Sequence, residues 1–119
     1  MSKHVIFTLS LKVSPSNLAA LLKVVQQLVA DTEKEEGSLT YEYFVSDDES
    51  TIAIHERYVD SAAADLHLTH TFPPYSESFA KFTETESFFI HGDVSTELKA
   101  TLKEAKVIYL KPFAGFDRY

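Results

Sequence analysis

The stretch from residue 36 to residue 70 contains the side chains of this chain that are best suited to chemistry. Its pattern predicts two alternating strands joined by an acidic turn at 47–50, followed by a helix. The second strand carries Glu56 among apolar neighbours, and the helix carries His67 and His70. A carboxylate and an imidazole that point into one partly apolar space can exchange protons with a bound ligand.

Glu56 is the first of these candidates. An alternating strand places it on the same face as Ile52, Ile54 and Tyr58. A carboxylate in such surroundings loses hydration, which raises its pKa unless a partner compensates, and a pKa near neutrality suits a general base. A structural interpretation is also open, in which Glu56 pairs with Arg57 or interacts with a helix N-terminus.

The two histidines are the next candidates. In a helix that begins at Ser61, the residues Leu66, His67 and His70 lie within an arc of about 100°. If Leu66 faces the sheet, both imidazoles approach the same space, where they could act as a base or orient another group near pH 7. The alternative is a histidine at the edge of the core whose ring bonds a backbone carbonyl.

A metal site is a weaker interpretation of the same residues. His67 and His70, with His55 or Glu56 nearby, could ligate zinc or iron, but a spacing of three residues is weakly specific. The chain has no Cys, which excludes disulfides, thiolate ligands and Cys nucleophiles. With three Gly it contains neither a P-loop nor a dinucleotide-binding fingerprint. We therefore expect no metal.

Aromatic residues are numerous, with nine Phe and six Tyr. Such side chains bury a large area in a core, and they also line pockets for flat apolar ligands. Both interpretations apply to the aromatic residues near the predicted hairpin and helices. Those that could line a cavity are Tyr41, Tyr43, Tyr58, Tyr75, Phe79 and Phe82.

The remaining periodicity predicts the elements that position these side chains. The order of strand, helix, strand, strand, helix, strand is that of a ferredoxin-like split βαβ fold. We therefore predict an α+β protein with an antiparallel sheet and helices on one face. The predicted strands are 4–13, 38–46, 51–59, 87–94 and 106–110, and the predicted helices are 15–36, 61–71, one starting at Pro73 and one starting at Ser95.

The length of 119 residues fits one domain, with a core at about 3–94 and a C-terminal extension at about 95–119. Because helices cover one face of the sheet, the other face is left bare, and it carries Ile6, Phe44, Val59 and Phe89. An apolar face of this size does not remain in contact with water. We therefore predict a two-fold homodimer.

Charge and hydropathy exclude several partners. The net charge of −7 disfavours nucleic acid and anionic membrane surfaces, because both are bound through Lys and Arg. No apolar run approaches the roughly 20 residues of a membrane span, and the first residues alternate as a strand does instead of forming a signal peptide. We expect a cytoplasmic protein.

Three short motifs follow one another in the central segment. They are Glu36-Gly37-Ser38-Leu39-x-Tyr41, then Glu56-x-Tyr58-x-Asp60, then an alanine pair at 62–63 followed by His67. This series resembles the antibiotic biosynthesis monooxygenase family, and the resemblance covers roughly residues 3–89. The part from 92 to 118 looks like an extension found in some members.

The resemblance implies a dimeric ferredoxin-like α+β barrel. Members of this family oxygenate polyphenols or quinols with dioxygen and without flavin, haem or metal. Carried over by position, Glu56 and His67 match a recurring Glu and His, so that one would remove a phenolic proton and the other would orient it. The electron-rich phenolate could then reduce dioxygen in a pocket that excludes water.

The resemblance also implies a substrate site between the sheet and the helices at 61–84. We predict Glu56 and His67 as catalytic residues, with no cofactor. The predicted substrate-binding residues are Tyr41, Tyr43, Tyr58, His70, Phe79 and Phe82.

The chain departs from the family pattern in two ways. It has no Trp, and Tyr58 stands where many members carry one. Its single Asn is Asn17, so the Asn and Trp of the haem-degrading and polyketide-oxidising branches are missing. The quinol monooxygenase branch is the nearest fit, with a small phenolic or quinol compound and dioxygen as partners. The alternatives are a non-catalytic dimeric barrel that binds or senses a small aromatic ligand, and a barrel that serves only in assembly.

Overall fold

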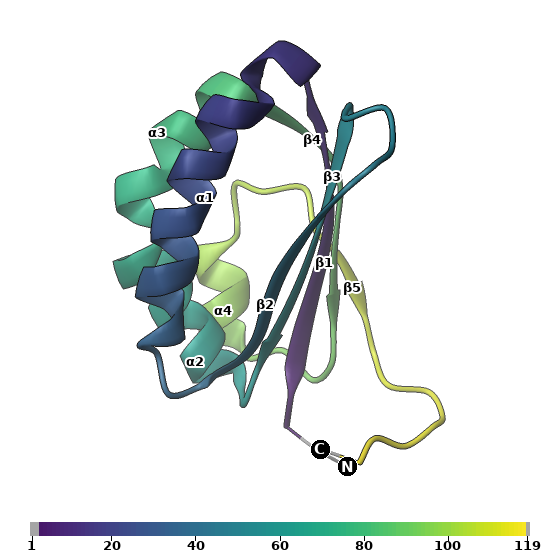
Figure 1. Ribbon diagram of the computed structural model, residues 1–119. Helices are drawn as coiled ribbons and strands as arrows, with labels where there is room; N and C mark the ends of the chain where they lie inside the picture. The colour runs from purple at the N-terminus through teal and green to yellow at the C-terminus, as the bar shows by residue number, and fades with distance from the viewer. Residues whose placement is uncertain (1–2, 119) are drawn as a thin grey trace.

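In the computed structural model, which describes residues 3–118, a five-stranded sheet is covered on one face by helices (Figure 1). This confirms the α+β fold with helices on one face. The sheet order is β2-β3-β1-β4-β5. The strands are β1 (Val5–Val13), β2 (Ser38–Val45), β3 (Thr51–Tyr58), β4 (Thr83–His91) and β5 (Ile108–Leu110).

The first four strands pair antiparallel, as predicted, but β5 runs parallel to β4 at the edge. The sheet is therefore mixed. The helix α4 (Thr96–Thr101) lies between β4 and β5 in the chain. A crossover through a helix returns the chain to the same end of the sheet, which is why the added strand is parallel.

The strands fold as their alternation predicts. On β1 the side chains of Val5, Phe7, Leu11 and Val13 are buried under the helices. In the sheet Glu56 of β3 stands opposite Phe7 of β1 on one side and opposite Tyr41 of β2 on the other. The register therefore places the carboxylate of Glu56 in the middle of the inner face, between two aromatic side chains.

The helix α1 (Leu18–Glu33), preceded by the 3₁₀ turn η1 (Pro15–Asn17), ends three residues before the predicted boundary. The backbone N–H of Lys34 bonds to the carbonyls of Asp31 and Thr32, which tightens the last turn and ends the helix. The buried stripe of α1 consists of Leu21, Val25, Leu28 and Thr32.

The predicted helix at 61–71 is helical throughout, but it changes type after Leu66. Asp60 caps α2 (Ser61–Leu66), because its Oδ1 accepts a hydrogen bond of 2.9 Å from the backbone N–H of Ala63. From His67 the chain forms a π-helical turn, η2 (His67–Thr71), in which the N–H of Phe72 donates to the carbonyl of His67. This wider turn changes the direction of every later side chain relative to an α-helix.

The strand β4 begins at Thr83, four residues before its predicted start, directly after α3 (Pro73–Phe82). The first half of β4 pairs only with β1, since β5 pairs with residues 89–91. Its polar residues Glu84, Thr85 and Glu86 are consequently exposed. A half-edge strand of this kind lacks the apolar alternation on which the sequence prediction depended.

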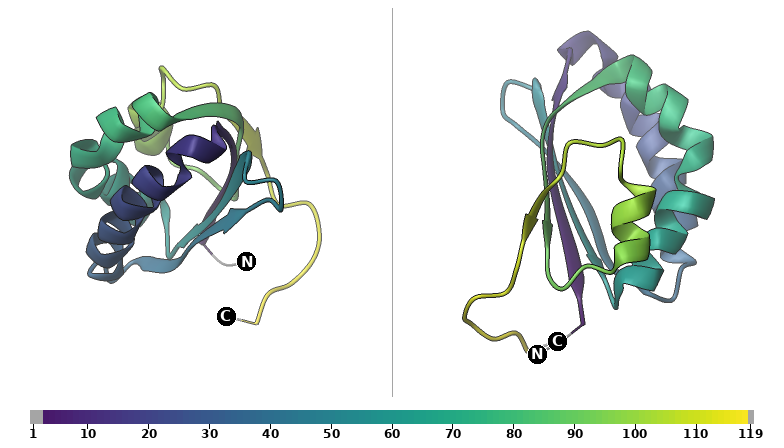
Figure 2. Two further views of the ribbon diagram at one scale, coloured as in Figure 1. Left: turned by 45° about the horizontal axis from the view of Figure 1, so that its top comes forward. Right: turned by 180° about the vertical axis from the view of Figure 1, so that it is seen from behind.

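The two faces of the sheet differ (Figure 2). Helices cover one face, and the C-terminal tail at 111–118 passes on the other side. Phe113 and Phe116 in this tail are fully or largely exposed, and Tyr119 lies outside the described residues. Among residues 3–118, no helix has both the length and the apolar character needed to cross a membrane.

Candidate active site

A cavity of about 200 Å³ lies between the helices and the inner face of the sheet. Its polar side chains include those of Glu56, His67, Tyr41 and Tyr43, and the rest of its wall is mainly apolar. The larger apolar contributors are Phe7, Leu9, Ile54, Phe72, Phe79 and Phe88.

The carboxylate of Glu56 is buried in this wall. The loss of hydration raises its pKa from 4.5 to about 7, and the charge of Glu35 adds to this rise. The hydroxyl of Tyr58 donates a hydrogen bond to Oε1 of Glu56, which opposes the rise. Arg57 is not a partner of Glu56, because neighbouring residues of a strand point to opposite faces and Arg57 bonds His4 on the outer face.

His67 lies beside Glu56 and is also buried. Its Nδ1 is 3.2 Å from Oε2 of Glu35, and its Nε2 is 3.9 Å from Oε1 of Glu56. Burial lowers the pKa of the imidazole below its ordinary value of 6.5, and the charge and hydrogen bond of Glu35 offset only part of this lowering. The imidazole is therefore neutral at pH 7 and is held by a carboxylate, not by a backbone carbonyl.

Glu35 is a residue of this site that the sequence reasoning missed. It lies in the loop after α1, and its side chain reaches His67 from 32 residues away. The available signal was the glycine two positions later. A Cβ on Gly37 would lie 2.5 Å from the Cβ of Ala63, so only glycine allows this loop to contact α2. That contact brings Glu35 to the π-helical turn.

Two tyrosines face the same cavity from β2. The hydroxyls of Tyr41 and Tyr43 are 2.8 Å apart and hydrogen-bonded, and the ring of Tyr41 lies 5.0 Å from that of His67. Burial, followed by the charge of Glu56, raises the pKa of both phenols well above its ordinary value. Both therefore remain protonated. Because each phenol has a single O–H and one of the two is used in their mutual hydrogen bond, one O–H of the pair is left to donate to an anionic ligand oxygen.

Three of the predicted substrate-binding residues lie elsewhere. His70 is exposed and its Nδ1 is hydrogen-bonded to the Thr69 hydroxyl, so the expected convergence of two imidazoles is wrong. The reason is the π-helical turn, together with Leu66, which is 47% exposed and does not face the sheet. Phe82 packs on the core outside the cavity, and Tyr58 lies behind Glu56. Phe79 lines the cavity, with Tyr41 and Tyr43.

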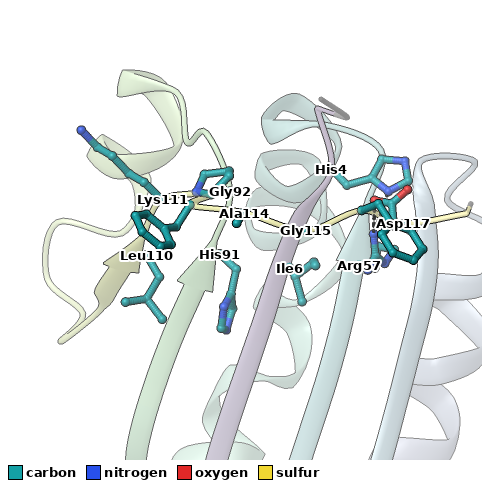
Figure 3. Close-up of a pocket in the computed structure, with 13 residues that line it drawn as sticks. His4, Ile6, Arg57, His91, Gly92, Leu110, Lys111, Ala114, Gly115 and Asp117 are labelled. Atoms are coloured by element: carbon teal, nitrogen blue, oxygen red, sulfur yellow. Dashed lines mark hydrogen bonds and ion pairs between the residues drawn. The ribbon is translucent and has the colours of Figure 1, made fainter.

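A second, larger hollow of about 670 Å³ lies on the outer face (Figure 3). It is a trough between the C-terminal tail and the end of the sheet, where Ile6 and His91 line its floor. Arg57 lies near Asp117 at one side, with 3.7 Å between Nη1 and Oδ2. Much of its wall is exposed tail, so it lacks the enclosed apolar surroundings that perturb Glu56.

Metal binding has no support from the grouping of side chains. Among residues 3–118, no three His, Asp or Glu side chains are placed so that they could share a metal ion. Glu35, His67 and Glu56 instead form a line, with the imidazole between the carboxylates. This arrangement suits the transfer of protons along the line.

The family model for antibiotic biosynthesis monooxygenases matches residues 4–86. The chain belongs to the antibiotic biosynthesis monooxygenase family. The match includes the loop with Glu35, the strand with Glu56 and the turn with His67. The family resemblance predicted from the sequence is thereby confirmed, whereas its quinol branch stays a prediction. No curated protein matches the sequence significantly.

Solved structures share the fold. MupZ from Pseudomonas fluorescens is 20% identical with a TM-score of 0.85, over 99% of this chain and 91% of that one. SO0527 from Shewanella oneidensis is 27% identical with a TM-score of 0.62, over 76% of this chain and 88% of that one. A Caulobacter crescentus protein, assigned provisionally to the antibiotic biosynthesis monooxygenases, is 24% identical with a TM-score of 0.66, over 75% of this chain and 86% of that one. The alignment with MupZ thus includes the C-terminal extension.

Proposed function

We propose that the protein is a cytoplasmic, homodimeric, cofactor-independent monooxygenase that oxidises a small phenolic or quinol compound with dioxygen. Membership of the family supports an oxygenase or oxidoreductase. The observation that carries the proposal is Glu56, a carboxylate whose pKa is raised to about 7 on the wall of an apolar cavity beside a neutral imidazole. Such a group can remove a phenolic proton near neutral pH.

The proposed reaction begins when Glu56 accepts the hydroxyl proton of the substrate. The phenolate transfers one electron to dioxygen, and the resulting radical pair forms a carbon–oxygen bond at a ring carbon that carries hydrogen. The peroxide anion formed in this way takes the proton back and becomes a hydroperoxide. Loss of water then produces a quinone, so that one oxygen atom enters the product and the other leaves as water. One hydroxyl of the Tyr41–Tyr43 pair would donate a hydrogen bond to the phenolate oxygen, with the other hydroxyl donating to the first, and the apolar wall would exclude bulk water.

The size of the cavity limits the substrate. An apolar cavity of roughly 150 Å³ is enough for one benzene molecule. The volume of about 200 Å³ therefore suits one substituted ring or a compact bicyclic compound. Phe72 and Phe79 lie in edge contact at 5.4 Å between ring centres, and they supply aromatic surface for such a ring.

Oxygen uptake with a menadiol-type quinol tests this function. Wild type, Glu56→Gln and His67→Ala are compared, with Glu77→Gln on the exposed face of α3 as the control. We expect turnover to fall about 100-fold in both site variants, the usual contribution of a positioned base, and to be unchanged in the control. Full turnover in both site variants would refute the assignment. Binding of quinol without turnover in wild type would favour the non-catalytic ligand-binding protein.

The homodimer is proposed from the bare face of the sheet. The side chains of Phe44, Phe89, Ile108 and Leu110 point to this face, and Phe44 is 48% exposed. A second copy of the chain offers the same apolar face, so that two copies can cover each other. The exposed aromatic tail beside this face adds further apolar surface.

Sedimentation velocity tests this assembly. Wild type should sediment at twice the chain mass of 13.4 kDa, and Phe44→Glu should shift it toward the monomer. Leu22→Glu is the matched control, because Leu22 is 52% exposed but lies on the helical layer. A wild-type monomer at micromolar concentration would refute the dimer, as would equal dissociation by both substitutions.

A further inference from the structure

We propose that Glu35 is the positioning residue of a proton relay that leads from Glu56 to His67. The inference rests on the proposed function and extends it to a residue that does not line the cavity. It assigns a role to a carboxylate in the loop between α1 and β2, on the far side of the imidazole from the cavity wall.

Both oxygens of Glu35 are engaged. Oε1 accepts a hydrogen bond of 2.5 Å from the hydroxyl of Ser38, and Oε2 lies 3.2 Å from Nδ1 of His67. The Glu35 side chain is 8% exposed and that of His67 is 2% exposed. The carboxylate is therefore held in one orientation and is shielded from water, where its interaction with the imidazole is strong.

This contact determines which nitrogen of His67 carries the proton. A carboxylate only accepts hydrogen bonds, so Nδ1 must be the N–H donor toward Glu35. A neutral imidazole has a single N–H, which leaves Nε2 with its lone pair. That lone pair is on the side of Glu56, with 3.9 Å between Nε2 and Oε1.

The relay follows from this tautomer. When Glu56 has taken the proton from the substrate, a decrease of about 1 Å in the distance between its Oε1 and Nε2 of His67 brings the carboxyl O–H within hydrogen-bond distance of that nitrogen. The proton can then pass to Nε2, which restores the carboxylate and forms an imidazolium stabilised by Glu35. The peroxide anion formed on the ring carbon takes this proton back and becomes the hydroperoxide, so that the cycle is balanced before water leaves.

The surroundings favour retention of one proton within the relay. His67 is faced by Glu35 from the α1–β2 loop, by Glu56 and Tyr58 from β3, and by Tyr41 from β2. Tyr43 lies next to Tyr41. These groups are anionic or neutral, so no other cation competes with an imidazolium at this position. Two full negative charges, one on each side of a buried imidazole, are costly, and a proton held on the imidazole relieves them.

The protonation state of the His67 ring is a direct test that needs no substrate. In ¹⁵N spectra of wild type at pH 8, the His67 ring should be neutral, with Nδ1 protonated and Nε2 unprotonated. Glu35→Gln should lose this preference, because its amide can also donate to Nδ1. Glu36→Gln, an exposed neighbour in the same loop, is the matched control and should retain it. A wild-type ring protonated at Nε2 would overturn the proposal even if the variants failed to fold.

Kinetics supply the second readout. Glu35→Gln should lower kcat at least about 10-fold with KM within about twofold, since the residue acts through His67 and does not touch substrate. The acidic limb of the pH–rate profile should move to lower pH, because Glu56 loses a negative neighbour. Ser38→Ala keeps the charge of Glu35 and removes one hydrogen bond to its Oε1, so the kcat of this variant should lie between those of wild type and Glu35→Gln. An unchanged kcat and profile in Glu35→Gln would overturn the relay.

The two proposals can fail separately. If wild type does not oxidise quinols, the proposed function fails, while the ¹⁵N spectra still report whether Glu35 sets the tautomer of His67. If quinols are oxidised but the Nε2 proton is present, the relay fails and the oxygenase remains.

Discussion

Replacing Glu56 with Gln should stabilise the protein, and the gain should grow as the pH rises. In the folded chain the buried carboxyl has a pKa of about 7, against an ordinary value of 4.5. The folded state therefore holds the proton more tightly than the unfolded state. The contribution of this group to stability is complete below pH 4.5 and is lost as the pH rises to about 7.

The size of the loss follows from the two values. Each pKa unit corresponds to about 1.4 kcal/mol, so the interval from 4.5 to about 7 corresponds to about 3 kcal/mol. Gln resembles the protonated carboxyl in shape, and its carbonyl can still accept the hydrogen bond from Tyr58. Because Gln does not ionise, the variant avoids this cost.

Chemical denaturation at pH 5 and pH 8 measures the effect. We expect the stability of Glu56→Gln relative to wild type to increase by about 2–3 kcal/mol between these pH values, or about 10 °C in Tm for a chain of this length. The control Glu77→Gln, at an exposed position of α3, should differ from wild type in stability by the same amount at pH 5 and at pH 8. A variant less stable than wild type at pH 8, or a gain independent of pH, would refute the reasoning. A gain in stability together with a loss of turnover is expected for a residue that serves activity at a cost in stability.

Three further substitutions test other parts of the structure. Gly37→Ala should lower the free energy of unfolding in urea by about 2 kcal/mol, because its Cβ would lie 2.5 Å from that of Ala63. The double variant with Ala63→Gly should recover part of this loss, and purely additive effects would contradict the close contact. Glu49→Gly should raise stability by about 0.5–1 kcal/mol, since Glu49 has φ of 61° at the hairpin tip, and a loss on thermal denaturation would contradict this. Tyr58→Phe removes the hydrogen bond that lowers the pKa of Glu56, so the acidic limb of kcat/KM against pH should move upward; an unmoved limb would show that the bond does not tune the base.

The sequence by itself determined the architecture and half of the candidate site. Alternation of apolar residues in β1 and β3 is a local property, and it correctly predicts which side chains point inward, Glu56 among them. The same holds for the Asp60 cap and for the order of the elements, since each depends on neighbours within a few residues. These local signals, with the family resemblance, were sufficient for the α+β fold with helices on one face, but not for the parallel strand β5 at its edge.

Only the tertiary structure decided which groups meet Glu56. The contact between Glu35 and His67 joins residues 32 positions apart, and it depends on the packing of the loop at Gly37 against α2. The π-helical turn buries His67 and exposes His70, whereas a regular helix would have brought both to one side. Periodicity describes a single element in isolation. The position of one element on another is determined by close packing between side chains distant in the sequence, and no local pattern records it.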